Sequence, residues 1–177
     1  MAPEVLNLYV DGASRGNQHT MEERSTGWGF LAVLGPEGEG GSGTIIAEDS
    51  GTVVTDPNQV GYWGADVESN NTAELTAFIQ ALRWALMEGG DSNIVVCTDS
   101  TYAGNMATGA WRPKTNLEII SRLRSLWNEV DRIRGVRWLH VRAHRGHRWN
   151  ERADHLAGRA ADGSPPLPLS FWKPGKR

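Results

Sequence analysis

Residues 93–100, NIVVCTDS, place an unbroken run of four apolar side chains directly before a threonine and an aspartate. A continuous apolar run of this length is typical of a strand that is buried on both faces, as in a parallel sheet. Parallel strands cannot be joined by a tight turn and need a longer crossover, which is usually a helix. We therefore expect helices on both sides of this segment.

The flanking segments do change to the helical period. Within residues 71–90 the apolar side chains recur three and four positions apart and stop at a pair of glycines, which predicts an amphipathic helix. A short helix is expected at 100–107, a long one from 115 to 135, and a last one from about residue 150. Residues 136–142, VRWLHVR, separate the last two helices and predict a further strand.

The N-terminal third of the chain has a different pattern, in which short apolar runs are separated by polar and glycine-rich turns. Extended segments are expected at 4–11, 28–35, 44–48, 52–55 and 60–67. Segments joined in this way form an antiparallel meander, onto which the later strands add in parallel. The sequence therefore predicts an α/β fold: a mixed five-stranded sheet, three antiparallel strands plus two parallel, with helices on both faces.

Length and composition set limits on the class of protein. A chain of 177 residues is enough for one domain, and the single cysteine excludes an internal disulfide and a cysteine-rich metal site. No apolar stretch approaches the roughly 18 residues of a membrane span, and the N-terminus has no leader pattern. We expect a cytoplasmic monomer, with a domain at 1–162 and a proline-rich tail at 163–177.

Charge is distributed unevenly along the chain. Residues 1–111 contain three arginines and fifteen acids, whereas residues 112–148 contain ten lysines or arginines and three acids. This asymmetry is compatible with a surface that faces a polyanion. A solvated basic helix would give the same composition, and charge alone does not decide between them.

Four carboxylates stand at positions where elements begin or end. Asp11 and Asp99 follow predicted strands, and Glu74 and Asp154 lie in the expected first turns of helices. Residues at the carboxyl ends of adjacent parallel strands face a common crevice. Carboxylates gathered there repel one another unless cations neutralise them, and Mg²⁺ prefers such oxygen ligands.

Each of these acids also has an ordinary structural explanation. Asp11 fits a turn with the glycine that follows it, and Asp99 fits a helix N-cap. Glu74 is spaced from Asn71 as in a capping box, and Asp154 favours the positive end of a helix. Position alone leaves these alternatives open.

Four blocks together carry a resemblance to a known family. The blocks are YVDGASRGN (9–17), ESNNTAELTAFIQAL (68–82), VVCTDSTYAGN (95–105) and VRAHRGHRWNERADHLA (141–157). In content, order and spacing they resemble the type I ribonuclease H family, over roughly residues 5–162. The resemblance implies the mixed five-stranded ribonuclease H-like fold. It also implies a metal-dependent endoribonuclease that cuts the RNA strand of RNA/DNA hybrids and leaves 5′-phosphate and 3′-hydroxyl ends.

The resemblance also assigns roles to residues. It implies two Mg²⁺ ions per site, with Mn²⁺ as a possible substitute, held by Asp11, Glu74, Asp99 and Asp154. His144 matches the family's mobile histidine, while His147 and Asn150 match positions that we interpret as supports for the loop and the helix start. No membrane and no obligate protein partner is implied.

Substrate contacts follow from the same resemblance. The positions that match contacts to the RNA strand are Gly12, Ser14, Asn70, Asn71 and Thr101, and those that match the DNA phosphate pocket are Asn17 and Ser69. The alternative for Asn70 and Asn71 is that they form only a turn and a helix cap.

The chain departs from the family pattern where many members carry a basic protrusion. Only GAWRPKTN (109–116) stands there, which is too short for one, so substrate affinity must be supplied elsewhere. Two rival functions are a DNA nuclease of the same superfold and a module that binds hybrids without cutting them. The asparagine pair before Glu74 argues against the first, and the retention of all four acids argues against the second.

Overall fold

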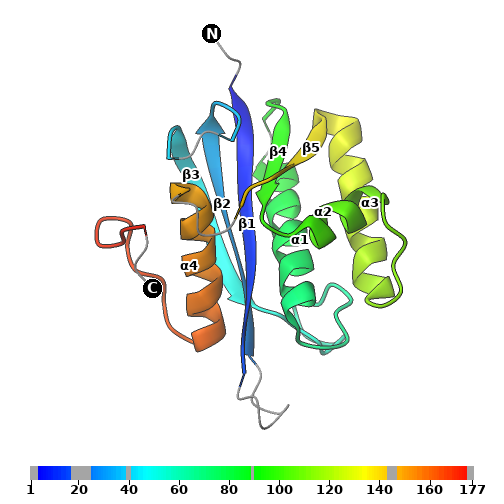
Figure 1. The fold of residues 1–177 in the computed structure, drawn as a ribbon. Coiled ribbons are helices and arrows are strands. Elements are labelled where there is room, and N and C mark those ends of the chain that lie inside the picture. The colour runs from blue at the N-terminus through cyan, green and yellow to red at the C-terminus, as the bar shows by residue number, and fades with distance from the viewer. Residues whose placement is uncertain (1–3, 17–24, 39–40, 89, 143–146, 175–177) are drawn as a thin grey trace.

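The computed structural model describes residues 4–16, 25–38, 41–88, 90–142 and 147–174. Its core is a single five-stranded sheet in the order β3-β2-β1-β4-β5 (Figure 1). The strands are β1 (Val5–Arg15), β2 (Ser25–Gly35), β3 (Thr44–Thr52), β4 (Ile94–Thr98) and β5 (Val136–His140). β1 and β3 pair antiparallel with β2, while β4 pairs parallel with both β1 and β5, as the sequence predicted.

Helices cover both faces of this sheet. α1 (Asn70–Glu88), α2 (Thr101–Thr108) and α3 (Leu117–Arg134) pack on one face, and α4 (Arg148–Asp162) packs on the other (Figure 1). The larger core lies between the sheet and the first three helices, and a smaller core lies under α4. The described part of the chain has no helix long and apolar enough to span a membrane.

The start of α1 differs from the expected capping box. Ser69 Oγ accepts a hydrogen bond from the Thr72 backbone N–H at 3.1 Å, and Thr72 Oγ1 accepts one from the Ser69 N–H at 2.9 Å. This reciprocal pair satisfies two donors that a helix N-terminus would otherwise leave without partners. The helix therefore begins earlier than expected, and Glu74 lies beyond its first turn and does not cap it.

The prediction of strands at 52–55 and 60–67 is wrong. β3 ends at Thr52, and the loop that follows it contains an isolated bridge between Val54 and Tyr62 but no strand. Pro57 in this loop has no backbone N–H to donate to a neighbouring strand. Gly61 and Gly64 adopt positive φ angles of 91° and 105°, which are not strand angles. Gly64 packs so close to the start of α3 that the loop follows the helix surface and not a strand edge.

α4 lies unusually close to the sheet. Gly27 and Gly29 of β2 face it, and a Cβ on Gly29 would be 2.7 Å from the Leu156 Cβ. The helix presents mostly small side chains to this surface, among them Ala153 and Ala157, both fully buried. Glycine on one side and alanine on the other allow the two backbones to approach closely.

Candidate active site

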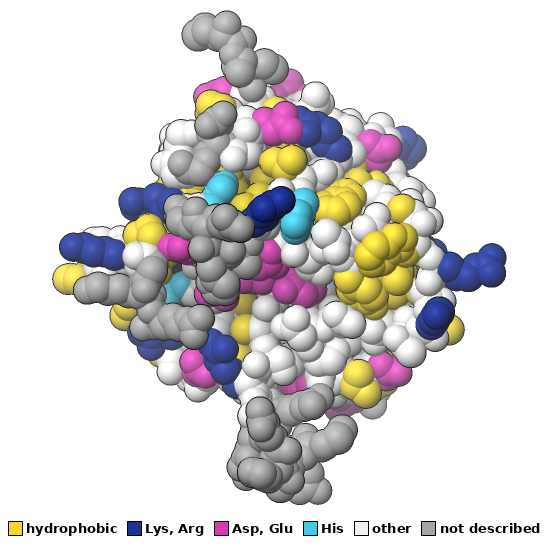
Figure 2. All heavy atoms as spheres, in the orientation of Figure 1, with side chains coloured by type: hydrophobic (Ala, Val, Ile, Leu, Met, Phe, Trp, Pro, Cys, Tyr) yellow, Lys and Arg dark blue, Asp and Glu magenta, His cyan; other side chains and the backbone are white. Residues whose placement is uncertain are grey.

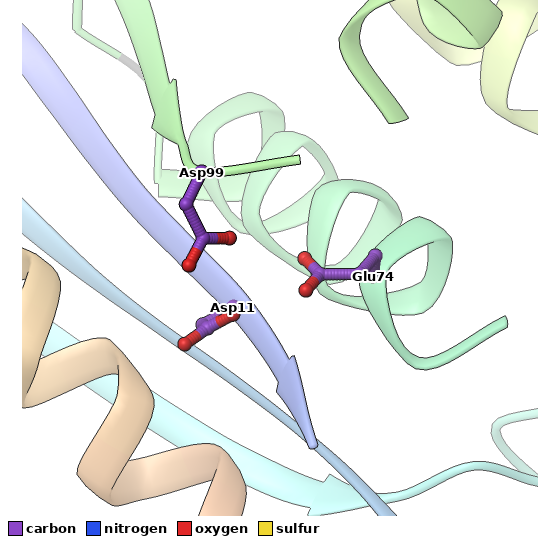
Figure 3. A group of neighbouring side chains, drawn as sticks. All are labelled: Asp11, Glu74 and Asp99. Atoms are coloured by element: carbon purple, nitrogen blue, oxygen red, sulfur yellow. The ribbon is translucent and has the colours of Figure 1, made fainter. Parts of the chain in front are cut away.

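Three carboxylates from distant parts of the chain meet beside β1, the central strand of the sheet (Figure 3). Asp11 of β1, Glu74 of α1 and Asp99, which follows β4, each offer an oxygen, and these oxygens all lie within 4.8 Å of one another. Asp11 is 4% exposed and Glu74 is 5% exposed. The site is therefore a nearly buried cluster of acids, which is unfavourable without a compensating positive charge.

The fold explains why these three meet. β1 and β4 are parallel neighbours, with Tyr9 opposite Cys97, so residues 11 and 99 both lie two positions beyond that pair. Gly12 faces α1, and a Cβ there would be 2.5 Å from the Glu74 nitrogen. The missing side chain lets α1 approach β1 closely enough for Glu74 to reach Asp11 within β1 and Asp99 after β4.

Burial and mutual repulsion raise the pKa of the two buried acids. Burial raises the pKa of Asp11 well above its usual value, and the charges of Glu74, Asp99 and Asp154 add to the effect. Burial and the Asp99 charge raise the pKa of Glu74 from 4.5 to about 8. Without a cation, the cluster therefore retains protons at neutral pH.

The site fits a divalent cation. Glu74 Oε2 is buried and has no hydrogen-bond partner among the described residues, so one ligand oxygen is available for an ion. All three side chains offer hard oxygen donors, which suit Mg²⁺ or Mn²⁺, and a cation would also offset the mutual repulsion. Asp11, Glu74 and Asp99 are the side chains placed to hold it.

Asp154, the fourth predicted ligand, stands apart from the cluster. It is the seventh residue of α4, past the first turn that the sequence predicted, because His147 caps a helix that already begins at Arg148. Its charge raises the pKa of both Asp11 and Glu74, which places it electrostatically within reach of them. Asp154 is half-buried on α4, which packs on the face of the sheet opposite α1.

Comparison with known proteins identifies the family. The RNase H family model matches residues 3–162. This chain belongs to the ribonuclease H family. It is 36% identical to the ribonuclease H of Dinoroseobacter shibae over 183 residues, which covers 98% of this chain and 96% of that protein.

Solved structures give the same answer for the fold. The crystal structure of the ribonuclease H1 of the archaeon Halobacterium salinarum is 30% identical, with a TM-score of 0.63, covering 90% of this chain and 98% of that one. LC11-RNase H1, whose crystal structure contains an RNA/DNA hybrid, is 22% identical with a TM-score of 0.61. The match covers 89% of this chain and 97% of LC11-RNase H1. The chain is accordingly a metal-dependent ribonuclease, and its fold is the ribonuclease H-like fold.

On the surface of this ribonuclease H the acidic side chains gather near the middle of the face drawn in Figure 2. Histidine and Lys or Arg side chains lie beside them in that view. His144, the predicted mobile histidine, and Asn17 lie outside the described residues. Acidic and basic side chains thus lie side by side on this face.

The alternative explanation of Asp99 as a helix N-cap is not found in the structure. Ser100, and not Asp99, is the N-cap of α2, since its Oγ accepts a hydrogen bond from the Ala103 N–H at 3.0 Å. His147 is the N-cap of α4: its Nδ1 accepts from the Asn150 N–H at 3.3 Å, and its Nε2 is 3.2 Å from the Gly38 carbonyl oxygen. Ser100 and His147 therefore cap α2 and α4, and the Asp99 carboxylate is not used as a cap.

The described residues that are predicted to contact substrate lie on β1 and at the starts of α1 and α2. Asn70, Asn71 and Thr101 are exposed at the starts of α1 and α2. Gly12 and Ser14 are half-buried on β1. Ser69 takes part in the cap of α1, so its hydroxyl has a structural role whatever else it contacts.

Sequence reasoning missed Arg152 and Glu48. Arg152 is 1% exposed and is paired with Glu48 of β3, 104 residues away. In the sequence Arg152 is one of several arginines near the start of α4, and nothing in that pattern distinguishes it from a solvated one.

Proposed function

We propose that this ribonuclease H cuts the RNA strand of RNA/DNA hybrids endonucleolytically, using two divalent ions, and leaves 5′-phosphate and 3′-hydroxyl ends. The observation that carries the proposal is the convergence of Asp11, Glu74 and Asp99, with oxygens within 4.8 Å of one another. Membership of the family and the hybrid bound to LC11-RNase H1 support the choice of substrate.

The carboxylates have the metal-holding role in this proposal. Asp11 of β1, Glu74 of α1 and Asp99 after β4 bind the ions, and Asp154 completes the set from α4. When bound, Mg²⁺ supplies Lewis-acid activation of a water and neutralises charge on the departing 3′ oxygen. Because Asp11 and Glu74 hold protons without a cation, metal binding releases protons from these two side chains.

The fold supplies the remaining requirements for catalysis. β1, β4 and α1 hold the acids in place before the substrate arrives, so that developing charge meets groups that are already oriented. His144, whose ordinary pKa lies near neutrality, moves a proton or assists product departure.

Selection of a hybrid requires separate contacts to the two strands. Asn70, Asn71 and Thr101, with the backbone amides of Gly12 and Ser14, contact the 2′-hydroxyls of the RNA, which mark it in a wide and shallow minor groove. Asn17 and Ser69 contact a phosphate of the DNA strand. These exposed polar groups at the starts of α1 and α2 are short enough to approach such a groove.

Affinity comes partly from the positive segment that follows α2. Arg124 donates hydrogen bonds to the carbonyls of Met106 and Trp111, and Arg122 pairs with Glu118 at 3.1 Å. Arg112 and Lys114 are exposed and are the groups in this connection that contact phosphate. Their contribution is sequence-independent and weakens with salt.

The domain of residues 1–162 acts as a monomer in the cytoplasm, and no other protein is needed for cleavage. Strand-labelled RNA/DNA hybrid, duplex DNA and duplex RNA, each incubated with Mg²⁺ and with EDTA, test the function. We expect RNA-strand cuts in the hybrid with Mg²⁺ alone, and end analysis that gives 5′-phosphates. Preferential cutting of duplex DNA would favour the rival nuclease, and tight hybrid binding without cleavage in Mg²⁺ or Mn²⁺ would favour a binding module.

A further inference from the structure

Arg152 lies at the centre of a buried polar network on the outer side of α4. Its guanidinium donates to both carboxylate oxygens of Glu48, at 2.9 and 2.6 Å, and to the Leu167 carbonyl at 2.8 Å. The guanidinium is therefore paired in two directions, with edge strand β3 and with the chain that follows α4. A buried charge is tolerated only with such complete pairing, so the network is specific in geometry.

The chain after α4 packs back along the same helix. We name residues 163–174 the C-terminal strap. The Leu167 N–H donates to His155 Nε2 at 3.0 Å, and Trp172, only 3% exposed, lies 6.1 Å from the His155 ring between centroids. The Arg152 guanidinium lies 5.3 Å from the centre of the Trp172 ring. The strap thus covers Arg152 and His155 on the side of α4 away from the active site.

Asp154 lies between these two residues in sequence but faces elsewhere. In a helix of about 3.6 residues per turn, positions two apart project to nearly opposite sides. Arg152 is directed to β3 and the strap, whereas the charge of Asp154 acts on Asp11 and Glu74. Rotation of α4 about its axis would therefore move Asp154 relative to the other acids.

The inner side of α4 packs directly on β2, with the backbone of Ala157 against Gly27 and Gly29 and the Leu156 side chain against Gly29. Trp149 packs in the smaller core under the helix. On the outer side, the paired Arg152 and the buried Trp172 tie the helix to β3 and to the strap.

We propose that Arg152, held by Glu48 and by the C-terminal strap, is a positioning residue that sets the rotation of α4 and so directs Asp154 toward Asp11 and Glu74. The proposal rests on the proposed function in one respect, that Asp154 contributes to metal binding. It assigns the strap, which lies beyond the part of the chain that the family model matches, a role in the active site.

Trp172→Ala tests the proposal, with Phe171→Ala as a matched control, because Phe171 is the adjacent residue and is 76% exposed. The readouts, taken well below the unfolding temperature, are the Mg²⁺ concentration for half-maximal cleavage, kcat and KM for hybrid, and the rise in Tm that Mg²⁺ causes without substrate. We expect Trp172→Ala to raise the half-saturating Mg²⁺ by about tenfold, as for loss of an outer contact to a metal ligand. The Mg²⁺-induced rise in Tm should shrink, with KM unchanged.

Trp172→Phe should restore the wild-type metal response, since it retains a ring over Arg152. Glu48→Gln leaves the strap intact and should also raise the half-saturating Mg²⁺ concentration. If Trp172→Ala does not fold, Glu48→Gln provides the test in its place. A lower metal-free Tm with an unchanged Mg²⁺ requirement in both variants would overturn the proposal and leave the strap only a stabilising role. If the wild type cut no hybrid, the proposed function would fail, while the Mg²⁺-induced rise in Tm would still test the positioning of Asp154.

Discussion

Gly12 and Glu74 are in backbone contact: a Cβ on Gly12 would lie 2.5 Å from the Glu74 nitrogen and 2.6 Å from the Ala73 carbonyl carbon. Both opposing atoms belong to helix backbone, which cannot move aside as a flexible side chain can. The absence of a side chain at position 12 therefore fixes the distance between β1 and α1, and with it the distance between Asp11 and Glu74.

Gly12→Ala should push α1 away from β1 and separate these two acids. Overpacking of this kind costs about 1–3 kcal/mol of stability, which calorimetric unfolding measures as a lower Tm. Hybrid cleavage should fall more steeply than stability, because the metal site is distorted directly. Full activity in a folded Gly12→Ala enzyme would show that the contact between Gly12 and α1 does not determine the distance between Asp11 and Glu74 that cleavage needs.

The stability of the metal-free enzyme should fall as pH rises from about 4.5 to about 8. The pKa of Glu74 is raised from 4.5 in the unfolded chain to about 8 in the folded one, so the native state holds a proton that the unfolded state has lost. The stabilisation is complete at pH values below the unfolded-state pKa of 4.5 and is lost as the pH rises through the folded-state pKa of about 8. Thermal melts in EDTA across this range measure it.

Glu74→Gln should flatten that pH dependence and raise the metal-free Tm at pH 8, since its amide carries no charge to bury. Saturating Mg²⁺ should stabilise the wild type at pH 8 and have little effect on the variant. A wild-type metal-free Tm that rises between pH 5 and 8 would contradict the assigned shift.

Asp99→Asn should lower cleavage by at least about a hundredfold, the cost of removing one preorganised charge-stabilising group. Its metal-free Tm should equal or exceed that of the wild type, because one of several repelling charges is gone. Asp66→Asn, at an exposed aspartate, is the control and should change neither quantity. A marked drop in the metal-free Tm of Asp99→Asn would count against a repelling cluster.

His144→Ala should slow turnover by about a hundredfold, as expected when a proton-transfer group is lost. The Mg²⁺-induced rise in Tm should stay at the wild-type value, because this histidine is not a metal ligand in the proposal. Stopped-flow cleavage with saturating hybrid measures the rate. Unchanged turnover would remove the assigned role.

The sequence predicted the sheet well because its signals are local. The apolar run at 94–97 and the helical period of α1 and α3 are visible within single segments, and parallel pairing follows from the crossovers between them. The loop at 53–67 was predicted wrongly because its β-branched and aromatic residues favour strands. Its backbone instead follows the positive φ angles of Gly61 and Gly64 and the contact with α3.

The candidate site was predicted in part for the same reason. Asp99 follows β4, and Asp11 lies just beyond the β1 residues that pair with β4, so their convergence follows from the parallel pairing of these strands. β1 itself runs on to Arg15, past the strand end at residue 11 that the sequence predicted. The positions of Glu74 and Asp154 within their helices were placed too near the start, because Ser69 and His147 begin those helices earlier than the apolar pattern indicates. The Arg152–Glu48 pair joins residues 104 apart, and no local pattern predicts such a contact.

Crystals grown with Mn²⁺ and measured at its absorption edge test the central claim most directly, because anomalous scattering locates the ion without assumptions about the protein. We predict an anomalous peak within coordination distance of Asp11, Glu74 and Asp99, which is absent from Asp99→Asn crystals prepared in the same way. A fully occupied Mn²⁺ elsewhere on the protein, with these three carboxylates unliganded, would contradict the account.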